Sequence, residues 1–237
     1  MVQLFTSETL FGEDYCQSGQ GINTAVRDLT GFDDHAKITD VKPFLITVYA
    51  SLDALESVQA RYGDCLSVYR REKTERLRDA IERQRGMLAE YCLIEALSRM
   101  GPLKLPLQIQ TERLGKPYLS DSPIAFSLSH AGLYAAATIS DCPVGVDIER
   151  ERTVSESLAK RICTPREWKQ IWLPSPTEQT FRNLFSAKES IVKRSGEGLM
   201  ALSTVDTKDY PVRQMEFLSY VLSVCSDRVE RWEVIKL

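Results

Sequence analysis

The fold of this chain is decided by one stretch of sequence, Val144-Gly145-Val146-Asp147-Ile148-Glu149. Its apolar side chains recur at every second position, which is the period of a half-buried β-strand. They are predicted to face a core, while Asp147 and Glu149 share the opposite face, roughly 7 Å apart along the strand. Two carboxylates held this close repel each other, and a hard cation such as Mg2+ relieves the repulsion. An exposed strand with two solvated acids is the alternative interpretation.

The composition is that of a globular domain, with 43% hydrophobic and 27% charged residues among 237. A net charge of -3 gives no global basic field that would indicate nucleic acid. We expect no membrane-spanning segment and no secretory signal, since no apolar run is long enough and residues 1–14 lack a basic region followed by an apolar one. The six cysteines are scattered without a C-x-x-C pair, which predicts reduced thiols in a cytoplasmic protein.

Upstream of the central strand, the patterns predict alternating strands and helices. A buried strand is expected over 44–49, a short helix over 53–62, and a long helical stretch in two parts from residue 70 to about 100, where Gly101-Pro102 stops it. A strand over 105–110, a turn over 115–119 and a hairpin over 124–139 follow. The helical stretch is predicted to bury one face, composed of Leu77, Ile81, Leu88, Tyr91 and Cys92.

Downstream, residues 153–182 are predicted to be mostly helical with interruptions. Thr164 begins one helix as its N-cap, with Pro165 at the first helical position and Glu167 completing a capping box. A further helix is expected to run through residues 185–193, and the loop at 196–199 ends it. Residue 212 and the ranges 215–224 and 229–237 are interpreted as antiparallel strands.

Several charged side chains have both a functional and an ordinary interpretation. Arg70, Lys73 and Arg76 follow a three-residue step, so they converge on a phosphate or form a solvated helix face with i,i+4 ion pairs. His130, at a strand end, presents an imidazole to an anion or is structural. Glu189 and Lys193 lie four residues apart on one helix face, where a surface ion pair is the ordinary interpretation.

The motifs line up in a fixed order: Gly115-Lys116-Pro117, Ser127-Leu128-Ser129-His130, Gly145-Val146-Asp147-Ile148-Glu149, Phe185-Ser186-Ala187-Lys188-Glu189-Ser190-Ile191-Val192-Lys193 and Gly196-Glu197-Gly198-Leu199. This order resembles the 4′-phosphopantetheinyl transferase superfamily, specifically the larger, pseudo-dimeric type that activates surfactin synthetase. The resemblance covers about residues 44–237. Phe185 stands where that family more often has tryptophan, and Ala131 stands where serine is expected.

The resemblance implies an α+β fold of two similar α/β halves, each a helix packed on a small antiparallel sheet. The active site would lie at their interface. The expected division is an irregular N-terminal extension over 1–42, an N-terminal half over 43–142, and a C-terminal half over 143–237 that carries the metal and catalytic motifs. The internal duplication predicts a monomer.

The implied activity is transfer of the 4′-phosphopantetheine group from coenzyme A to a serine of an apo acyl or peptidyl carrier protein. The reaction would depend on Mg2+ and release adenosine 3′,5′-bisphosphate. Coenzyme A and the apo carrier protein are the expected partners, with no nucleic acid and no membrane. Which carrier is served, and whether Mg2+ or Mn2+ is preferred, the sequence leaves open.

The resemblance also carries residue roles onto this chain. The implied metal ligands are Asp147, Glu149 and Glu189, with a water in the place that Ile148 is unable to fill. The implied catalytic residues are Glu189, as general base, with Lys193 and His130. The implied coenzyme-binding residues are Arg70, Lys73, Arg85, Lys116, Ser129, His130 and Lys193. Residues 152–163 resemble the segment that meets the carrier protein.

Two other functions compete with the transferase. One is a Mg2+-dependent enzyme that acts on another nucleotide diphosphate with the same three acids. The other is a non-enzymatic adaptor that binds a carrier protein, or RNA, through the basic helix over 70–85. The acidic net charge, and aromatic residues that do not interleave with the basic run, argue against RNA.

Overall fold

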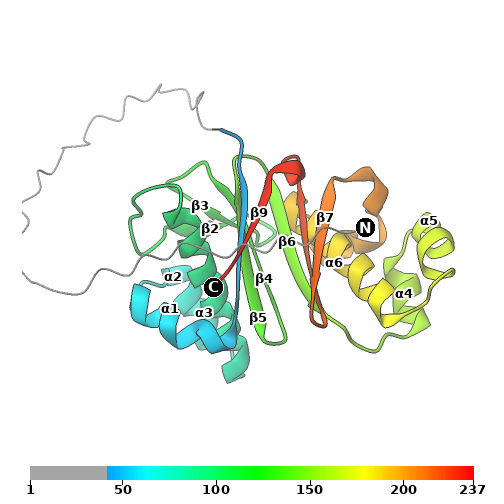
Figure 1. The fold of residues 1–237 in the computed structure, drawn as a ribbon, viewed down its shortest axis with the longest axis horizontal. Helices are drawn as coiled ribbons and strands as arrows, with labels where there is room; N and C mark the ends of the chain where they lie inside the picture. The colour runs from blue at the N-terminus through cyan, green and yellow to red at the C-terminus, as the bar shows by residue number, and fades with distance from the viewer. Residues whose placement is uncertain (1–41) are drawn as a thin grey trace, which may run out of the picture. The chain divides into compact units, whose positions relative to one another are not determined.

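The structure, a computed structural model, describes residues 42–237, which form a mixed α+β fold around two sheets (Figure 1). The larger sheet has the order β4-β5-β1-β9, formed by Ala125–Ala131, Tyr134–Ser140, Leu45–Ser51 and Trp232–Lys236. The smaller sheet has the order β6-β8-β7, formed by Val144–Arg150, Tyr220–Ser226 and Val212–Phe217. The predicted α+β class is confirmed. The extension expected over residues 1–42 lies, apart from Lys42, outside the described residues.

Helices cover the two sheets separately. The larger sheet is covered by α3 (Ala80–Ser98), flanked by α1 (Leu55–Tyr62) and α2 (Val68–Arg76). The smaller sheet is covered by α6 (Glu178–Ser195). The remaining elements are α4 (Glu156–Ile162), α5 (Pro165–Glu167), the π-helical turn η2 (Trp168–Trp172), the two-stranded ribbon of β2 (Ile109–Thr111) and β3 (Pro117–Leu119), and 3-10 turns at Leu52–Ala54, Leu199–Ser203, Thr207–Asp209 and Val229–Arg231. The predicted capping box joining Thr164 and Glu167 is present.

Small residues on β5 let elements approach it from both sides. Ala135 and Ala137 belong to the core beneath α3, whereas Ala136 belongs to the cluster that includes Val146 and Ile148 of β6. Successive strand residues face opposite sides of a sheet, so β5 is buried throughout its length. The strand therefore packs against α3 on one face and toward the smaller sheet on the other.

The central strand β6 is more buried than its alternating pattern predicts. Val146 and Ile148 face a core, as expected, but the opposite face is also covered, and Asp147 is only 3% exposed. The covering element is α6, which approaches so closely at Gly145 that an added Cβ would lie 1.9 Å from the carbonyl oxygen of Ser190. The half-buried strand predicted from the sequence is therefore wrong on its acidic face, because a helix lies there.

The helical stretch after residue 67 breaks where the sequence pattern suggested continuous burial. Helix α2 ends at Arg76, and Asp79 begins α3 by accepting hydrogen bonds from the amides of Ile81 and Glu82. Leu77 lies in the link and Ile81 in the first turn of α3, and both are exposed. Their predicted burial is wrong, whereas Leu88, Tyr91 and Cys92 are fully buried as expected.

The last strand pairs differently from the prediction. Strand β9 runs parallel to β1, with Trp232 opposite Leu45, and its indole nitrogen donates a 2.7 Å hydrogen bond to Thr47. The antiparallel arrangement expected for 229–237 is therefore wrong. The single strand expected over 215–224 is wrong too, because a turn at Leu218 divides it between β7 and β8, which pair antiparallel with each other. The strand expected over 105–110 is reduced to β2.

Two observations concern the thiols and the helices of the described part of the chain. Its cysteines are all free thiols. None of its helices combines the length and the apolar character that crossing a membrane requires.

Candidate active site

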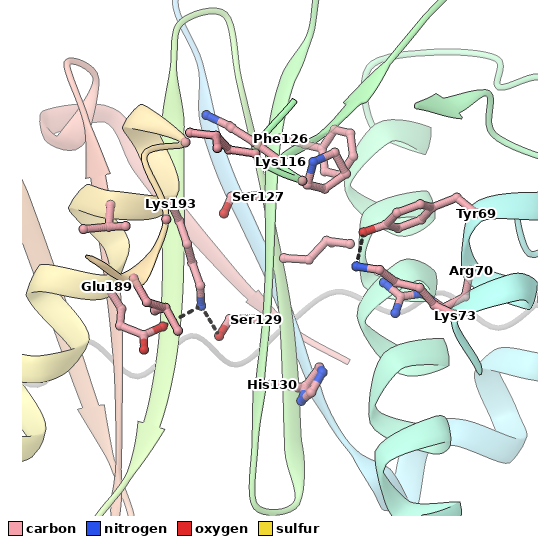
Figure 2. A pocket seen from close by; sticks show the side chains of 18 residues that line it. Tyr69, Arg70, Lys73, Lys116, Phe126, Ser127, Ser129, His130, Glu189 and Lys193 are labelled. Atoms are coloured by element: carbon pink, nitrogen blue, oxygen red, sulfur yellow. Dashed lines mark hydrogen bonds and ion pairs between the residues drawn. The ribbon is translucent and has the colours of Figure 1, made fainter. Parts of the chain in front are cut away.

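A cavity of about 600 Å³ lies between α2, β4 and α6 (Figure 2). This volume is in the range of small-molecule sites. The charged and polar side chains that line it come from distant parts of the sequence: Tyr69, Arg70, Lys73, Lys116, Ser127, Ser129, His130, Glu189 and Lys193. The cavity is therefore rich in cations, with one carboxylate at its α6 wall.

Helix α6 supplies the wall that carries Glu189 and Lys193. The helix begins at Thr177, whose hydroxyl accepts the amide of Thr180, and it ends at Gly196, whose φ of 77° favours glycine. Between these caps, Glu189 and Lys193 are one turn apart, and their charged groups lie 3.4 Å from each other. A helix through 185–193 that ends before the loop at 196–199 is confirmed, although it begins earlier than predicted, at Glu178. Its Glu189 and Lys193 side chains face the cavity together (Figure 2).

Lys193 connects α6 to the strands behind it. Its ammonium nitrogen lies 2.6 Å from Oδ1 of Asp147 and 2.9 Å from the hydroxyl of Ser129. The Ser129 hydroxyl also donates to Asp147 at 2.9 Å and accepts the amide of Ile148 at 3.2 Å. This network holds β4, β6 and α6 at one point beside the cavity.

The three predicted metal ligands influence one another electrostatically. Burial and the charges of Asp147 and Glu189 raise the pKa of Glu149 to about 7, against the opposing charge of Arg152, whose guanidinium lies 3.8 Å away. Burial and Asp147 raise the pKa of Glu189, while Lys193 lowers it. Burial opposes the charge on Lys193, but Asp147 and Glu189 outweigh that effect and raise its pKa.

These acids fit a divalent cation, although their present partners are cations of the protein. Within residues 42–237, no group of three or more His, Cys, Asp or Glu side chains is already gathered as a metal site. Yet Oδ2 of Asp147 is buried and has no hydrogen-bond partner among the described residues. An unpartnered carboxylate oxygen, together with acids that raise the pKa of Glu149, is the environment that a hard cation would stabilise. Ile148 points into the core and offers no ligand.

His130 lies on β4, facing the cation-rich side of the cavity. Burial lowers its pKa below 6.5, and the charges of Arg70, Lys193 and Arg85 lower it further, whereas Glu82 raises it. Its Nδ1 lies 3.7 Å from a carboxylate oxygen of Glu82. The imidazole is therefore mostly neutral at pH 7, which leaves it free to donate one hydrogen bond and accept another.

Helix α2 supplies the wall opposite α6. Arg70 lines the cavity although only 7% of the residue is exposed. Lys73 also lines it and donates a 2.6 Å hydrogen bond to the hydroxyl of Tyr69. Arg76 does not join them: it pairs with Glu72 across solvent at 3.8 Å, with its side chain 79% exposed. The predicted convergence of all three basic residues is therefore wrong at Arg76, which lies at the solvated end of α2.

The other two basic residues named from the sequence have different surroundings. Lys116 lines the cavity, but its ammonium group donates to the carbonyl of Arg194 at the C-terminal end of α6, and burial lowers its pKa. Arg85 is not among the lining residues. It donates to the carbonyl of Gly132 and pairs with Glu82, so it reaches the site only through its charge on His130.

Sequence reasoning missed several residues of the site. Phe126, Leu199 and Tyr69 line the cavity and give it an apolar part, and Glu82 faces His130. Tyr69 adjoins the basic run of α2, which is a weak signal. Nothing in the sequence marks Glu82, because its approach to His130 depends on how α3 packs against β4.

A cavity that combines cations with buried acids suits a phosphorylated ligand. A family model described as the 4′-phosphopantetheinyl transferase superfamily matches residues 143–232. The 4′-phosphopantetheinyl transferase Sfp of Bacillus subtilis (strain 168) is 30% identical over 156 residues, which are 64% of this chain and 70% of the relative. The transferase psf-1 of Bacillus pumilus is 32% identical over 139 residues, 56% of this chain and 59% of the relative.

The chain belongs to the 4′-phosphopantetheinyl transferase superfamily. It is an enzyme of the transferase class, and the resemblance identified from its motifs is confirmed.

Proposed function

We propose that this enzyme transfers the 4′-phosphopantetheine group of coenzyme A to a serine hydroxyl of an apo acyl or peptidyl carrier protein, with Mg2+ as cofactor. The observation that carries the proposal is the composition of one cavity: Glu189 and Lys193 on α6 face Arg70 and Lys73 on α2. Coenzyme A carries a pyrophosphate and a separate phosphate ester. A cavity with cations at both walls suits a substrate with two anionic centres.

In this proposal the two walls of the cavity bind different phosphate groups of coenzyme A. Arg70 and Lys73 bind the 3′-phosphate, whereas Lys116, Lys193 and His130 bind the pyrophosphate. The hydroxyl of Ser129 donates to Asp147 in the structure and would turn to the substrate to join them. Arg85 contributes charge from outside the cavity. The apolar lining of Phe126 and Leu199 fits the uncharged parts of the substrate.

The reaction then needs one proton acceptor and one neutralised leaving group. The serine hydroxyl of the carrier gives its proton to Glu189, whose raised pKa suits a base working near neutral pH. The serine oxygen bonds to the phosphorus next to the pantetheine arm, and the bond from that phosphorus to the bridging oxygen breaks. Adenosine 3′,5′-bisphosphate leaves, and Lys193 offsets the negative charge that develops.

Asp147, Glu149 and Glu189 would hold Mg2+, which supplies charge neutralisation to the pyrophosphate. Before it binds, Lys193 and Arg152 keep the first two of these acids paired. The fit rests on the unpartnered oxygen of Asp147 and on the raised pKa of Glu149.

The carrier protein is proposed to dock on residues 152–163. This segment exposes Arg152, Lys160 and Arg161, and Arg152 lies 3.8 Å from Glu149 of β6. The guanidinium of Arg152 lies over the ring of Phe185, 5.1 Å from its centroid, so it is held near the cavity. Basic side chains at this position would steer an acidic carrier helix toward the site.

The proposed architecture is a pseudo-twofold pair of halves, 43–142 and 143–237, with the active site between them. The support is that α2 and β4 come from the first half and α6 from the second. Strand β9 crosses into the first sheet, so the halves share a sheet as well as a site. A monomer in the cytoplasm completes the proposal, and sedimentation analysis tests the oligomeric state.

The experiment is incubation of the full chain with coenzyme A, Mg2+ and apo carrier proteins from fatty acid, polyketide and nonribosomal peptide systems, followed by mass spectrometry of the carrier. We expect one phosphopantetheinyl group to be added to a serine, and the addition to stop when EDTA removes the metal. Glu189→Gln should remain folded and lose transfer. Unmodified carriers in every case would overturn the proposal, and activity retained in EDTA would overturn its metal dependence.

A further inference from the structure

Arg70 is a buried cation that lines the cavity, and its guanidinium has fewer hydrogen-bond partners than it has N–H groups. Its side chain is 8% exposed, and its Nε makes no hydrogen bond to any residue of 42–237. Burying a charged group is costly unless other groups hold and neutralise it. The residues behind Arg70 therefore decide where its charge is presented.

Glu90 of α3 holds both the start of α2 and the Arg70 side chain. It is fully buried, and its two oxygens accept hydrogen bonds from the amide and the hydroxyl of Ser67 at 2.6 and 2.9 Å. The Ser67 hydroxyl in turn accepts the amide of Arg70 at 3.1 Å, as the N-cap of α2. One Glu90 oxygen also lies 3.5 Å from Nε of Arg70. A single carboxylate thus fixes the backbone that carries Arg70 and pairs with its guanidinium.

Gly86 lies one helical turn before Glu90, on the same face of α3. A Cβ at this position would lie 2.8 Å from Nη1 of Arg70, 3.6 Å from Cζ and 3.8 Å from Cδ. The guanidinium therefore occupies the space that a side chain would take. Glycine is an unfavourable residue in the interior of a helix. At this position it leaves the space that the Arg70 guanidinium fills.

The free side of the guanidinium faces the cation-rich wall of the cavity. Arg70 lines that wall together with Lys73 and His130 (Figure 2), and its charge contributes to the lowered pKa of His130. Because Glu90 shares its carboxylate with Ser67, it leaves hydrogen-bonding capacity on Arg70. A guanidinium with unused donors in a cationic pocket is suited to a phosphate group.

We propose that Gly86 and Glu90 are positioning residues that seat Arg70 against α3 and aim it at the 3′-phosphate of the substrate. This inference rests on the proposed function, since it assigns a phosphate of coenzyme A to Arg70. It adds that recognition of this phosphate depends on two residues that do not line the cavity.

The test compares binding of two nucleotides that differ only in that phosphate, adenosine 3′,5′-bisphosphate and adenosine 5′-monophosphate, by calorimetry with the full chain. The wild type should bind the bisphosphate about ten- to hundredfold more tightly, as expected for charge-assisted hydrogen bonds. Gly86→Ala should reduce this preference at least about fivefold while leaving the melting temperature nearly unchanged, since helix propensity favours alanine. Gln84→Ala, at an exposed position of the same helix, is the matched control and should keep the preference.

Two further variants connect the effect to Arg70. Arg70→Ala should reduce the preference at least as far as Gly86→Ala does, leaving only what Lys73 provides. Adding Gly86→Ala to it should have no further effect, because the two changes act through one guanidinium. Glu90→Gln keeps an acceptor for Ser67 but removes the charge, and it should reduce the preference as Gly86→Ala does. A preference that survives in both Gly86→Ala and Glu90→Gln would overturn the inference while carrier modification by the wild type continues to support the transferase. A wild type that binds both nucleotides equally would overturn it as well.

Discussion

The ammonium nitrogen of Lys193 lies 2.6 Å from Oδ1 of Asp147 and joins helix α6 to strand β6. Asp147 is almost fully buried, and its other oxygen has no hydrogen-bond partner in the described part of the chain. Lys193 is therefore the main counter-charge for a buried carboxylate, in addition to its proposed role toward the pyrophosphate. Lys193 would therefore stabilise the leaving group during the reaction, and it stabilises the fold when no substrate is bound.

Replacing Lys193 with methionine should test this structural role. The change leaves Asp147 buried without its cation, and we expect the free energy of unfolding to fall by about 2–3 kcal/mol, less than for a fully buried pair because Lys193 is partly exposed. Urea denaturation measures the loss. Lys169→Met, at an exposed position, is the control and should change stability by less than about 0.5 kcal/mol. Equal stabilities for the two variants would contradict the role assigned to Lys193.

The acids of the proposed metal site should make stability depend on pH and on Mg2+. The pKa of Glu149 is about 7 in the folded protein against its usual 4.5, so the folded state binds the proton more tightly than the unfolded state. The stability that this proton provides is present below about pH 4.5 and is lost as pH rises through 7. The shift corresponds to roughly 3 kcal/mol, and the raised pKa of Glu189 acts in the same direction.

Thermal melts in EDTA should therefore give a melting temperature that falls between pH 5.5 and pH 8. Added Mg2+ should raise it more at pH 8 than at pH 5.5, because ionised carboxylates bind the cation more strongly. Glu149→Gln removes one titrating acid and should flatten the pH dependence. A Mg2+ effect that is the same at both pH values would contradict the assignment of these acids to the metal.

The parts of the fold that could be predicted from the sequence are those encoded by local periodicity. Strand β6, the hairpin of β4 and β5, and the end of α6 each follow from alternation or turn residues. The errors arose where packing between distant elements decides. No local pattern shows that α6 covers the acidic face of β6. None shows that β9 pairs in parallel with β1 either, because the two strands lie at opposite ends of the described chain.

In the site, too, spacing along one helix could be predicted from the sequence, whereas packing between elements could not. Glu189 and Lys193 could be paired from their spacing on one helix, and their ion pair is present. Arg76 could not be separated from Arg70 and Lys73 by spacing, since α2 ends there and its last turn faces solvent. The role proposed for Gly86 depends on a contact with Arg70 that only the packing of α2 on α3 creates.

A methyl group at Gly145 should disrupt the packing of α6 on β6. The added Cβ would lie 1.9 Å from the carbonyl oxygen of Ser190 and 2.4 Å from the amide nitrogen of Arg194, and neither backbone atom moves unless the helix moves. We expect Gly145→Ala to cost about 3 kcal/mol or more of stability. Gly63→Ala is an informative control, because its Cβ meets no atom within 4 Å but its φ is 59°, so only about 1–2 kcal/mol of backbone strain is expected.

Removing one charge of the buried pair of Lys188 and Glu167 should destabilise the protein more than removing both. Both side chains are fully buried, with Nζ 2.6 Å from Oε2, and Glu167 also accepts the amides of Thr164 and Thr207. Lys188→Met leaves the carboxylate uncompensated and should cost about 3–5 kcal/mol. The double variant Lys188→Met, Glu167→Gln removes both charges and keeps an amide oxygen as acceptor for one of these two amides, so it should recover part of that loss. Denaturant melts of the two variants measure the difference, and a double variant no more stable than Lys188→Met would show that the charge on Glu167 is not the source of the loss.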